Sequence, residues 1–376
     1  MTTERAAGAD VVVVGAGVIG LAVAWAVAAT GADVVVCDPT PATGASWAAA
    51  GMLAPVTESR IGEGHLAAAG IASLALWPAF AARLEACSGR AVGLRGEGTL
   101  AVGIDDDDRR ALDELAAVHR QLGLASERLT GRACRVLEPL LHPRLRAGLM
   151  VPGDHQVDPR ALLDALGVAG QAARVEVRTT AVAAVRGDGN RVCGVDLADG
   201  SVLRAPTVVI AAGCGSADVG VGGLAVRPVK GQILRLRADP LDLPLARTVR
   251  ALVHGQSVYL VPRDSGELVV GATMEERGFD TTVTAGAVAD LLRAAIEVIP
   301  QVGELELVET VARLRPATPD NAPLLGPGPL DGLIHATGHH RNGVLLTPLT
   351  VEAVLAVMAD RPIPAAVAPF DPMRFA

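Results

Sequence analysis

The stretch Val11-Val12-Val13-Val14-Gly15-Ala16-Gly17-Val18-Ile19-Gly20 decides the fold, because it joins a valine run to a glycine-rich turn. A continuous β-branched run is typical of a short strand buried on both faces of a parallel sheet. In the G-x-G-x-x-G pattern the first glycine permits a tight turn, and the second lets the backbone approach a pyrophosphate. The third allows close packing of strand and helix. Residues 19–30 predict that helix, whose N-terminus would offer N–H groups to phosphates.

A second apolar run, residues 32–37, predicts the next strand, and Asp38 follows it directly. A carboxylate in this place accepts hydrogen bonds from ribose hydroxyls and repels a 2′-phosphate. The pattern therefore argues against NADP. It does not separate FAD from NAD, because both carry an ADP moiety.

The bulk composition describes a globular protein with a large core. The chain has 376 residues, of which 50% are hydrophobic and 20% charged, and this length favours two domains. The net charge of −8 gives no sign of a basic, nucleic-acid-binding face. Its five cysteines are widely spaced and odd in number, which predicts reduced thiols and a cytoplasmic protein without a disulfide frame.

Three features of the sequence could be mistaken for a membrane span or a metal site. The uncharged run 11–29 is nearly long enough to cross a bilayer, but its glycines and the strand that follows favour a buried strand and helix, so no membrane contact is expected. The acidic run 105–108 is typical of a solvated helix start. His339 and His340 lack a third ligand at suitable spacing, and no metal is therefore predicted.

The remaining pattern alternates helices with groups of short strands. Asp158 followed by Pro159 marks a helix start. Helices are also predicted near 65–87, 106–122 and 285–298 and after Pro348, and strands across 175–212, 226–275 and 332–336.

Seven motifs together resemble the glycine oxidases of the D-amino-acid oxidase superfamily, of the kind found in thiamine biosynthesis. The resemblance covers nearly the whole chain, and its motifs are the segments 46–53, 207–213, 227–232, 258–263, 269–275, 313–316 and 338–348.

The resemblance implies an α/β fold in which a Rossmann-like FAD-binding domain is interleaved with a smaller α+β substrate domain built on an antiparallel sheet. The FAD-binding domain is expected at 9–90, 150–226 and 312–376, and the substrate domain at 91–149 and 227–311.

The resemblance also implies which residues face the cofactor, which is expected to be non-covalent FAD because no cysteine follows Cys214. Beyond the fingerprint and Asp38, these residues are Ser46, Ala50, Gly51, Met52, Gly213, His339, Arg341, Asn342, Gly343, Val344 and Leu345. Small residues at 46–53 would let the backbone pass a flat ring closely. The chain departs from the family at Cys214-Gly215-Ser216, where an aromatic residue is usual, and at Ser257, where some members have histidine.

For the substrate, the resemblance marks Arg315 as the binder of a carboxylate, with Tyr259 assisting and Arg341 at the pocket edge. A guanidinium fork suits a carboxylate because it can donate two parallel hydrogen bonds. Without the resemblance, Arg315 would be interpreted as a surface or ion-pair residue, and Tyr259, the only tyrosine, as part of the core.

The implied activity is oxidative deamination of glycine or a similar small amino acid by hydride transfer from Cα to flavin N5. The products would be an imine or glyoxylate, ammonia and, after reoxidation by O2, hydrogen peroxide, and glycine imine would serve thiazole formation. No side chain is expected to act as a base. A sarcosine or D-amino-acid oxidase, a non-catalytic FAD-binding module and an NAD-dependent dehydrogenase remain alternatives, and a homo-oligomer is expected.

Overall fold

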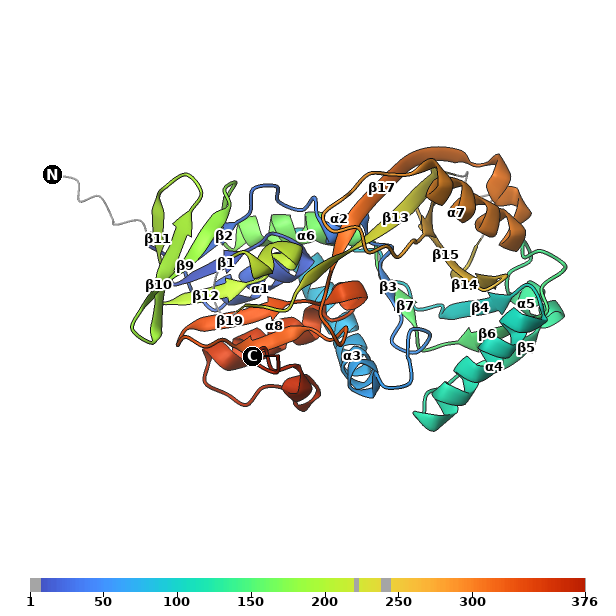
Figure 1. Cartoon of the computed structure of the whole chain (residues 1–376), viewed down its shortest axis with the longest axis horizontal. Coiled ribbons are helices and arrows are strands. Elements are labelled where there is room, and N and C mark those ends of the chain that lie inside the picture. Colours follow the sequence, from blue (N-terminus) through green and yellow to red (C-terminus); the bar gives the residue numbers. More distant parts are fainter. Residues whose placement is uncertain (1–7, 220–222, 238–244, 376) are drawn as a thin grey trace.

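The computed structural model describes residues 8–219, 223–237 and 245–375, and within them the chain forms two large sheets (Figure 1). The first sheet has six strands in the order β18-β19-β12-β1-β2-β8. Its strands are parallel except for the pair β18–β19. Their bounds are β1 Val11–Val14, β2 Val34–Cys37, β8 Glu176–Arg178, β12 Thr207–Ile210, β18 Leu324–Pro327 and β19 Leu333–Thr337.

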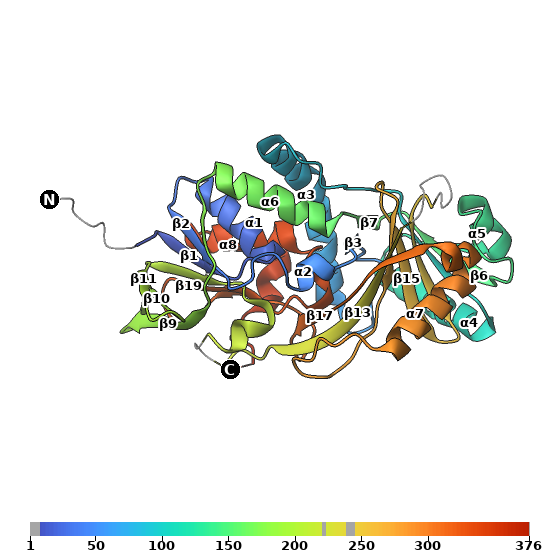
Figure 2. The same ribbon diagram turned by 90° about the horizontal axis from the view of Figure 1, so that it is seen from above.

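The valines of β1 explain how this sheet is covered on both faces. Val11 and Val13 pack into a cluster with the helices, whereas Val12 and Val14 pack against a three-stranded sheet on the other side (Figure 2). The helices are α1 Val18–Ala28, α3 Gly64–Ser88, α6 Pro159–Ala172 and α8 Thr347–Met358, and the small sheet contains β9 Val182–Asp188, β10 Arg191–Leu197 and β11 Val202–Arg204. The predicted buried parallel strand is therefore confirmed.

The second sheet has eight strands in the order β17-β13-β16-β15-β14-β4-β6-β5. It is antiparallel as predicted, except that β4 and β14 pair in parallel. The bounds are β4 Thr99–Gly103, β5 Glu127–Thr130, β6 Ala147–Val151, β13 Arg227–Arg237, β14 Thr248–Val253, β15 Gln256–Pro262, β16 Glu267–Gly271 and β17 Glu306–Ala317. The helices α4 Asp106–Gln121, α5 Gly131–Leu137 and α7 Ala285–Val298 accompany it (Figure 1).

Short elements connect the two sheets. The helix α2 Ala45–Ala48 and the pair β3 Met52–Leu53 with β7 His155–Gln156 lie between them, and the long strands β13 and β17 extend from the second sheet toward the first (Figure 2). Four 3-10 turns complete the described elements: η1 Gly213–Ala217, η2 Pro300–Glu304, η3 His340–Asn342 and η4 Ala365–Phe370. The exact division into two domains stays a prediction, and β6 and β17 run across two of its expected boundaries.

The acidic run 105–108 starts α4, as predicted. Asp105 caps the helix by accepting from the backbone N–H of Asp107 and Asp108. The carboxylate of Asp108 is buried and accepts from the N–H groups of His254 and Gly255, at 3.1 and 2.9 Å. Both carboxylates accept hydrogen bonds from backbone N–H groups, and the described ranges contain no group of three potential metal ligands.

Among the described residues one helix is apolar and long enough to cross a membrane, and it is α3 rather than the run 11–29 considered from the sequence. Trp77, Phe80 and Leu84 on its inner face are buried in the core beside α1, and α3 contacts α6 and α8. A core helix passes the same test of length and composition, so α3 is weak evidence for a membrane span.

We expect the protein to lose stability in mild acid because of His335, which lies in β19 with 1% of its surface exposed. Burial lowers the pKa of His335 to about 4. Below pH ~6.5 the unfolded chain takes up this proton while the folded protein does not, so stability present above that pH is lost as pH falls toward 4, by roughly 3 kcal/mol at most.

The measurement is urea unfolding at several pH values for the wild type and for His335→Leu, whose stability should depend less on pH in this window. Asp154 acts in the opposite direction, since burial raises the pKa of its carboxyl to about 6. Because Asp154 is present in both proteins, its effect cancels in the comparison. Parallel stability curves for the two proteins would show that His335 is not responsible.

Candidate active site

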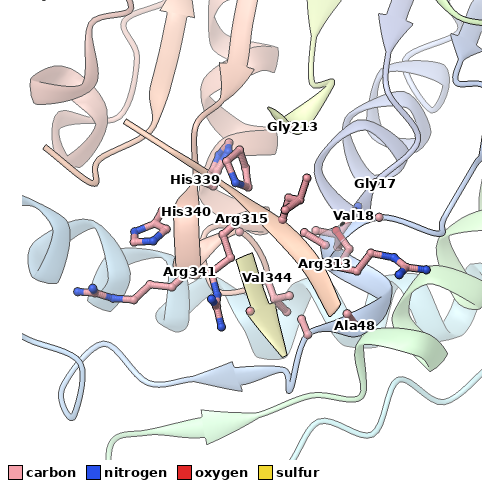
Figure 3. A pocket seen from close by; sticks show the side chains of 18 of the residues that line it. Gly17, Val18, Ala48, Gly213, Arg313, Arg315, His339, His340, Arg341 and Val344 are labelled. Carbon is pink, nitrogen blue, oxygen red and sulfur yellow. Dashed lines mark hydrogen bonds between the residues drawn. The ribbon is translucent and has the colours of Figure 1, made fainter. Parts of the chain in front are cut away.

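A cavity of about 1210 Å³ is lined by residues from both sheets and from the segments between them. Figure 3 shows Gly17 and Val18 of α1 at one end and Arg315, His340 and Arg341 at the other. Most residues predicted to face a cofactor or substrate line this cavity: Gly15, Gly17, Val18, Ile19, Asp38, Ser46, Ala50, Gly51, Met52, Gly213, Tyr259, Arg315, His339, Arg341, Gly343 and Val344. Ala16, Gly20, Asn342 and Leu345 do not.

The first end of the cavity has the geometry of a phosphate site. Gly15 adopts φ +104°, and a Cβ there would lie 2.8 Å from the carbonyl carbon of Ala211. Gly17 is the N-cap of α1 and supplies no side-chain cap, while the N–H of Val18 donates to Ser46 Oγ at 3.1 Å. An uncapped helix N-terminus beside a glycine turn suits a pyrophosphate.

Asp38 is fixed by the fingerprint turn itself. Its Oδ2 accepts from the N–H of Ala16 and its Oδ1 from the N–H of Thr40, both at 2.7 Å. Ala16 therefore positions Asp38 instead of lining the cavity. Each carboxylate oxygen keeps a second lone pair, and Asp38 can still accept from ribose hydroxyls.

Three arginines, of which Arg235 and Arg263 are buried, hold the segment from α2 to β3 by its backbone carbonyls. The carbonyl of Trp47 accepts from Arg160 at 3.3 Å and from Arg235 at 3.4 Å, and the carbonyl of Ala50 accepts from Arg263. Gly51, with φ +74°, is needed for contact within the protein, because a Cβ there would lie 2.7 Å from Pro159 Cδ. Gly51 is thus required for packing within the protein. That it also lets the backbone approach a flat ring stays a prediction.

The turn 338–348 divides its residues between two faces. Gly343 and Val344 line the cavity. Leu345 faces the other way, and its carbonyl accepts from Ser73 Oγ at 2.7 Å and from Trp77 Nε1 at 2.9 Å. Helix α3 therefore anchors this turn, which explains why Leu345 does not reach the cavity.

Arg315 is a cation of the cavity wall that could receive an anionic ligand. Its Nη1 donates to the carbonyl of Thr273 at 3.1 Å, and along the described chain no carboxylate lies within 4.0 Å of its guanidinium. Tyr259, on β15, lines the same cavity, close enough for the charge of Arg315 to act on its hydroxyl. Burial raises the pKa of Tyr259, although the charge of Arg315 opposes this, so the hydroxyl stays protonated.

Two glycines that the sequence did not single out make room for these side chains. A Cβ on Gly231 would lie 2.5 Å from Cζ and Nη2 of Arg315. A Cβ on Gly271 would lie 2.6 Å from Cζ of Tyr259. Both are strand glycines, in β13 and β16, so their role becomes visible only once the strands are placed side by side.

Arg341, unlike Arg315, is already paired. Its Nε lies 3.1 Å from Glu58 Oε2, and its Nη2 lies 2.7 Å from Glu63 Oε2. Glu58 forms a second ion pair, in which its Oε1 lies 2.5 Å from Arg250 Nη1. Burial disfavours the charged form of Glu58, yet Arg250 and Arg341 together hold its pKa below the usual range.

Glu58 and Arg250 could not be found from the sequence because neither belongs to a recognised motif. Thr273 and Met274 lie within the motif 269–275, but the motif alone did not indicate that Thr273 is a partner of Arg315 or that Met274, with 59% of its surface exposed, lines the cavity. Strand register brings Arg250 opposite Tyr259. That pairing is the only signal, and it requires the sheet order.

Comparison with known proteins agrees with this geometry. Residues 10–356 match the model of a family described as "FAD dependent oxidoreductase". The chain is 34% identical to a glycine oxidase of Geobacillus kaustophilus, over 97% of each protein, and 32% identical to one of Pseudomonas putida, over 91% of this chain and 92% of that protein. A crystal structure of the Geobacillus enzyme superposes with a TM-score of 0.90 at 32% identity, covering 98% of this chain and 99% of that one.

A further relative is longer than this protein. The chain is 33% identical to the bifunctional protein ThiO/ThiG of Synechocystis over 97% of its own length, but it spans only 54% of that relative. The predicted resemblance is confirmed by these alignments, and the choice of FAD over NAD follows from the family match. The chain belongs to the family of FAD dependent oxidoreductases, and FAD is its cofactor.

Proposed function

We propose that the protein oxidises the Cα–N bond of glycine or a similarly small amino acid, using FAD bound along the cavity. The observation that carries this proposal is Arg315, whose guanidinium lines the cavity without a carboxylate partner among the described residues. The names of the relatives, which are glycine oxidases, support the choice of an amino acid.

The residues divide the work along the cavity. Gly15, Gly17 and Asp38 would hold the pyrophosphate and ribose, and the loop 46–52 with Val344 would flank the ring system. Arg315 would bind the carboxylate in a fork, and the protonated hydroxyl of Tyr259 would donate to it. This would leave Cα directed at the cofactor, and such positioning is a large part of catalysis.

Bound FAD supplies a two-electron oxidation of the amine, with O2 as final acceptor and hydrogen peroxide as product. The imine formed would hydrolyse to glyoxylate and ammonia. The protein contributes orientation and charge. A role in thiazole formation stays a prediction, and so does assembly into a homo-oligomer.

The test is anaerobic reduction of the purified holoenzyme by glycine. We expect the visible flavin absorbance to bleach, and air to restore it with release of hydrogen peroxide. Acid precipitation should release the flavin into the supernatant, because FAD is expected to be non-covalent. Bleaching by sarcosine or a D-amino acid but not by glycine would move the assignment to those substrates, and bleaching by no amine would favour a non-catalytic FAD-binding protein.

A further inference from the structure

His340 is a buried imidazole without a partner at the substrate end of the cavity. Its side chain lines the cavity with 8% of the residue exposed. Both Nδ1 and Nε2 are buried and make no hydrogen bond to any residue that the structure describes. An unsatisfied buried polar group is unfavourable by about 1–3 kcal/mol, so such a ring is expected to find its partner in a ligand.

The neighbouring histidine shows what a satisfied ring looks like in this turn. His339 is equally buried, but its Nε2 lies 3.0 Å from Thr350 Oγ1. His340 also adopts φ +48°, a left-handed conformation that is uncommon for residues other than glycine. Strained residues of this kind cluster at ligand sites, where the surrounding fold holds them in place.

The charges around His340 keep its ring neutral. Burial lowers the pKa of His340 to about 4, and the positive charges of Arg341, Arg315 and Arg227 add to this effect, while Glu58 opposes it. A neutral imidazole carries one N–H donor and one free lone pair. A substrate carboxylate on Arg315 would offset one of these positive charges and make the ring more basic.

A neutral base is what the proposed substrate requires. An amino acid at neutral pH carries an ammonium group, and the nitrogen must lose a proton before Cα can give up a hydride. Glu58 is a poor acceptor because its two oxygens are paired with Arg250 and Arg341. Tyr259 is protonated and takes no proton.

We propose that His340 accepts the proton that the ammonium of the bound substrate releases. This inference rests on the proposed function. One N–H bond of the ammonium breaks and one N–H bond forms on the imidazole, leaving a neutral amine and an imidazolium with no change in total charge. The sequence predicted that no side chain acts as a base, and His340 is the residue that would do so.

The test compares the wild type with His340→Phe, which keeps a ring of similar shape but has no nitrogen. The rate of anaerobic flavin reduction by glycine is measured from neutral to alkaline pH in FAD-loaded protein. At neutral pH we expect a loss of about 100-fold in kcat/KM for the variant, in the range typical of a general base. The loss should vanish at alkaline pH, where the free substrate is already a neutral amine.

A second variant, His340→Asn, covers the case in which phenylalanine does not fit. Asparagine tolerates the left-handed conformation and forms hydrogen bonds, but it accepts no proton. The same alkaline shift of the pH profile is expected. A wild-type profile in His340→Asn would mean that hydrogen bonding suffices, and an unshifted profile in FAD-loaded His340→Phe would also overturn the proposal. A wild type that no amine reduces at any pH would instead overturn the proposed function.

Discussion

Replacing Arg315 with alanine is expected to leave a yellow, folded protein that glycine reduces about 1000-fold less efficiently. The wild-type guanidinium would give two charge-assisted hydrogen bonds to the carboxylate, each contributing roughly 1.5–3 kcal/mol. Since 1.36 kcal/mol corresponds to a factor of ten, losing both accounts for about three powers of ten in kcat/KM. Flavin binding should persist, because Arg315 lies away from Gly17 and Val18 at the N-terminus of α1 (Figure 3).

Two comparisons make this result specific. Arg315→Lys keeps the charge without the planar fork, so it should recover only part of the lost efficiency. Arg293→Ala removes an exposed arginine paired with Asp290 on α7 and should behave as wild type. A primary amine without a carboxylate should be oxidised at the same low rate by the wild type and by Arg315→Ala. Unchanged glycine turnover in Arg315→Ala would mean that the carboxylate binds elsewhere.

The cofactor half of the cavity could be predicted from sequence because its determinants are local. The turn from Gly15 to Gly20, the strand before it and Asp38 after it lie within one short βαβ unit, and the contacts are close in sequence. The hydrogen bond from the Ala16 N–H to Asp38 joins residues only 22 positions apart. A sequence pattern of this length is enough to predict the strand, turn and helix that it forms.

The substrate half is different in kind, because its partners are distant along the chain. Arg250 on β14 and Glu58 in the segment that follows β3 are separated by 192 positions, and they meet only in the folded chain. The resemblance supplied Arg315, Tyr259 and Arg341. It did not predict that Arg341 would be paired with Glu58 and Glu63 while Arg315 is left without a carboxylate partner.

His340 shows the same limit at a single residue. From sequence His340 was the second of two histidines in the motif 338–348, where it was considered as a metal ligand and not predicted to contact the cofactor or substrate. In the fold the ring of His340 is buried and both of its nitrogens are unpaired. The charges that act on it include Arg315 and Glu58, which belong to two other segments of the chain. No pattern within residues 338–348 separates His340 from His339.

Gly231→Ala is expected to lower kcat/KM for glycine by about 100-fold, although no residue that binds substrate is replaced. A Cβ at this position would lie 2.5 Å from Cζ of Arg315, so the guanidinium must move. The obstructed atoms are the end of a flexible side chain, and Gly231 lies in a regular strand, so the fold should tolerate the methyl group. Displacing the fork loses one of its two hydrogen bonds and part of the other, or roughly 3 kcal/mol.

The effect should appear chiefly in KM, since Arg315 keeps its charge but no longer meets the carboxylate in both bonds. Gly286→Ala is the matched control, because a Cβ on this exposed glycine of α7 meets no atom within 4 Å and alanine is the better helix former. It should leave kinetics unchanged and stability equal or slightly higher. Wild-type kinetics in Gly231→Ala would mean that Arg315 can bind the carboxylate from another rotamer. In that case the open face left by Gly231 does not determine where the substrate is held.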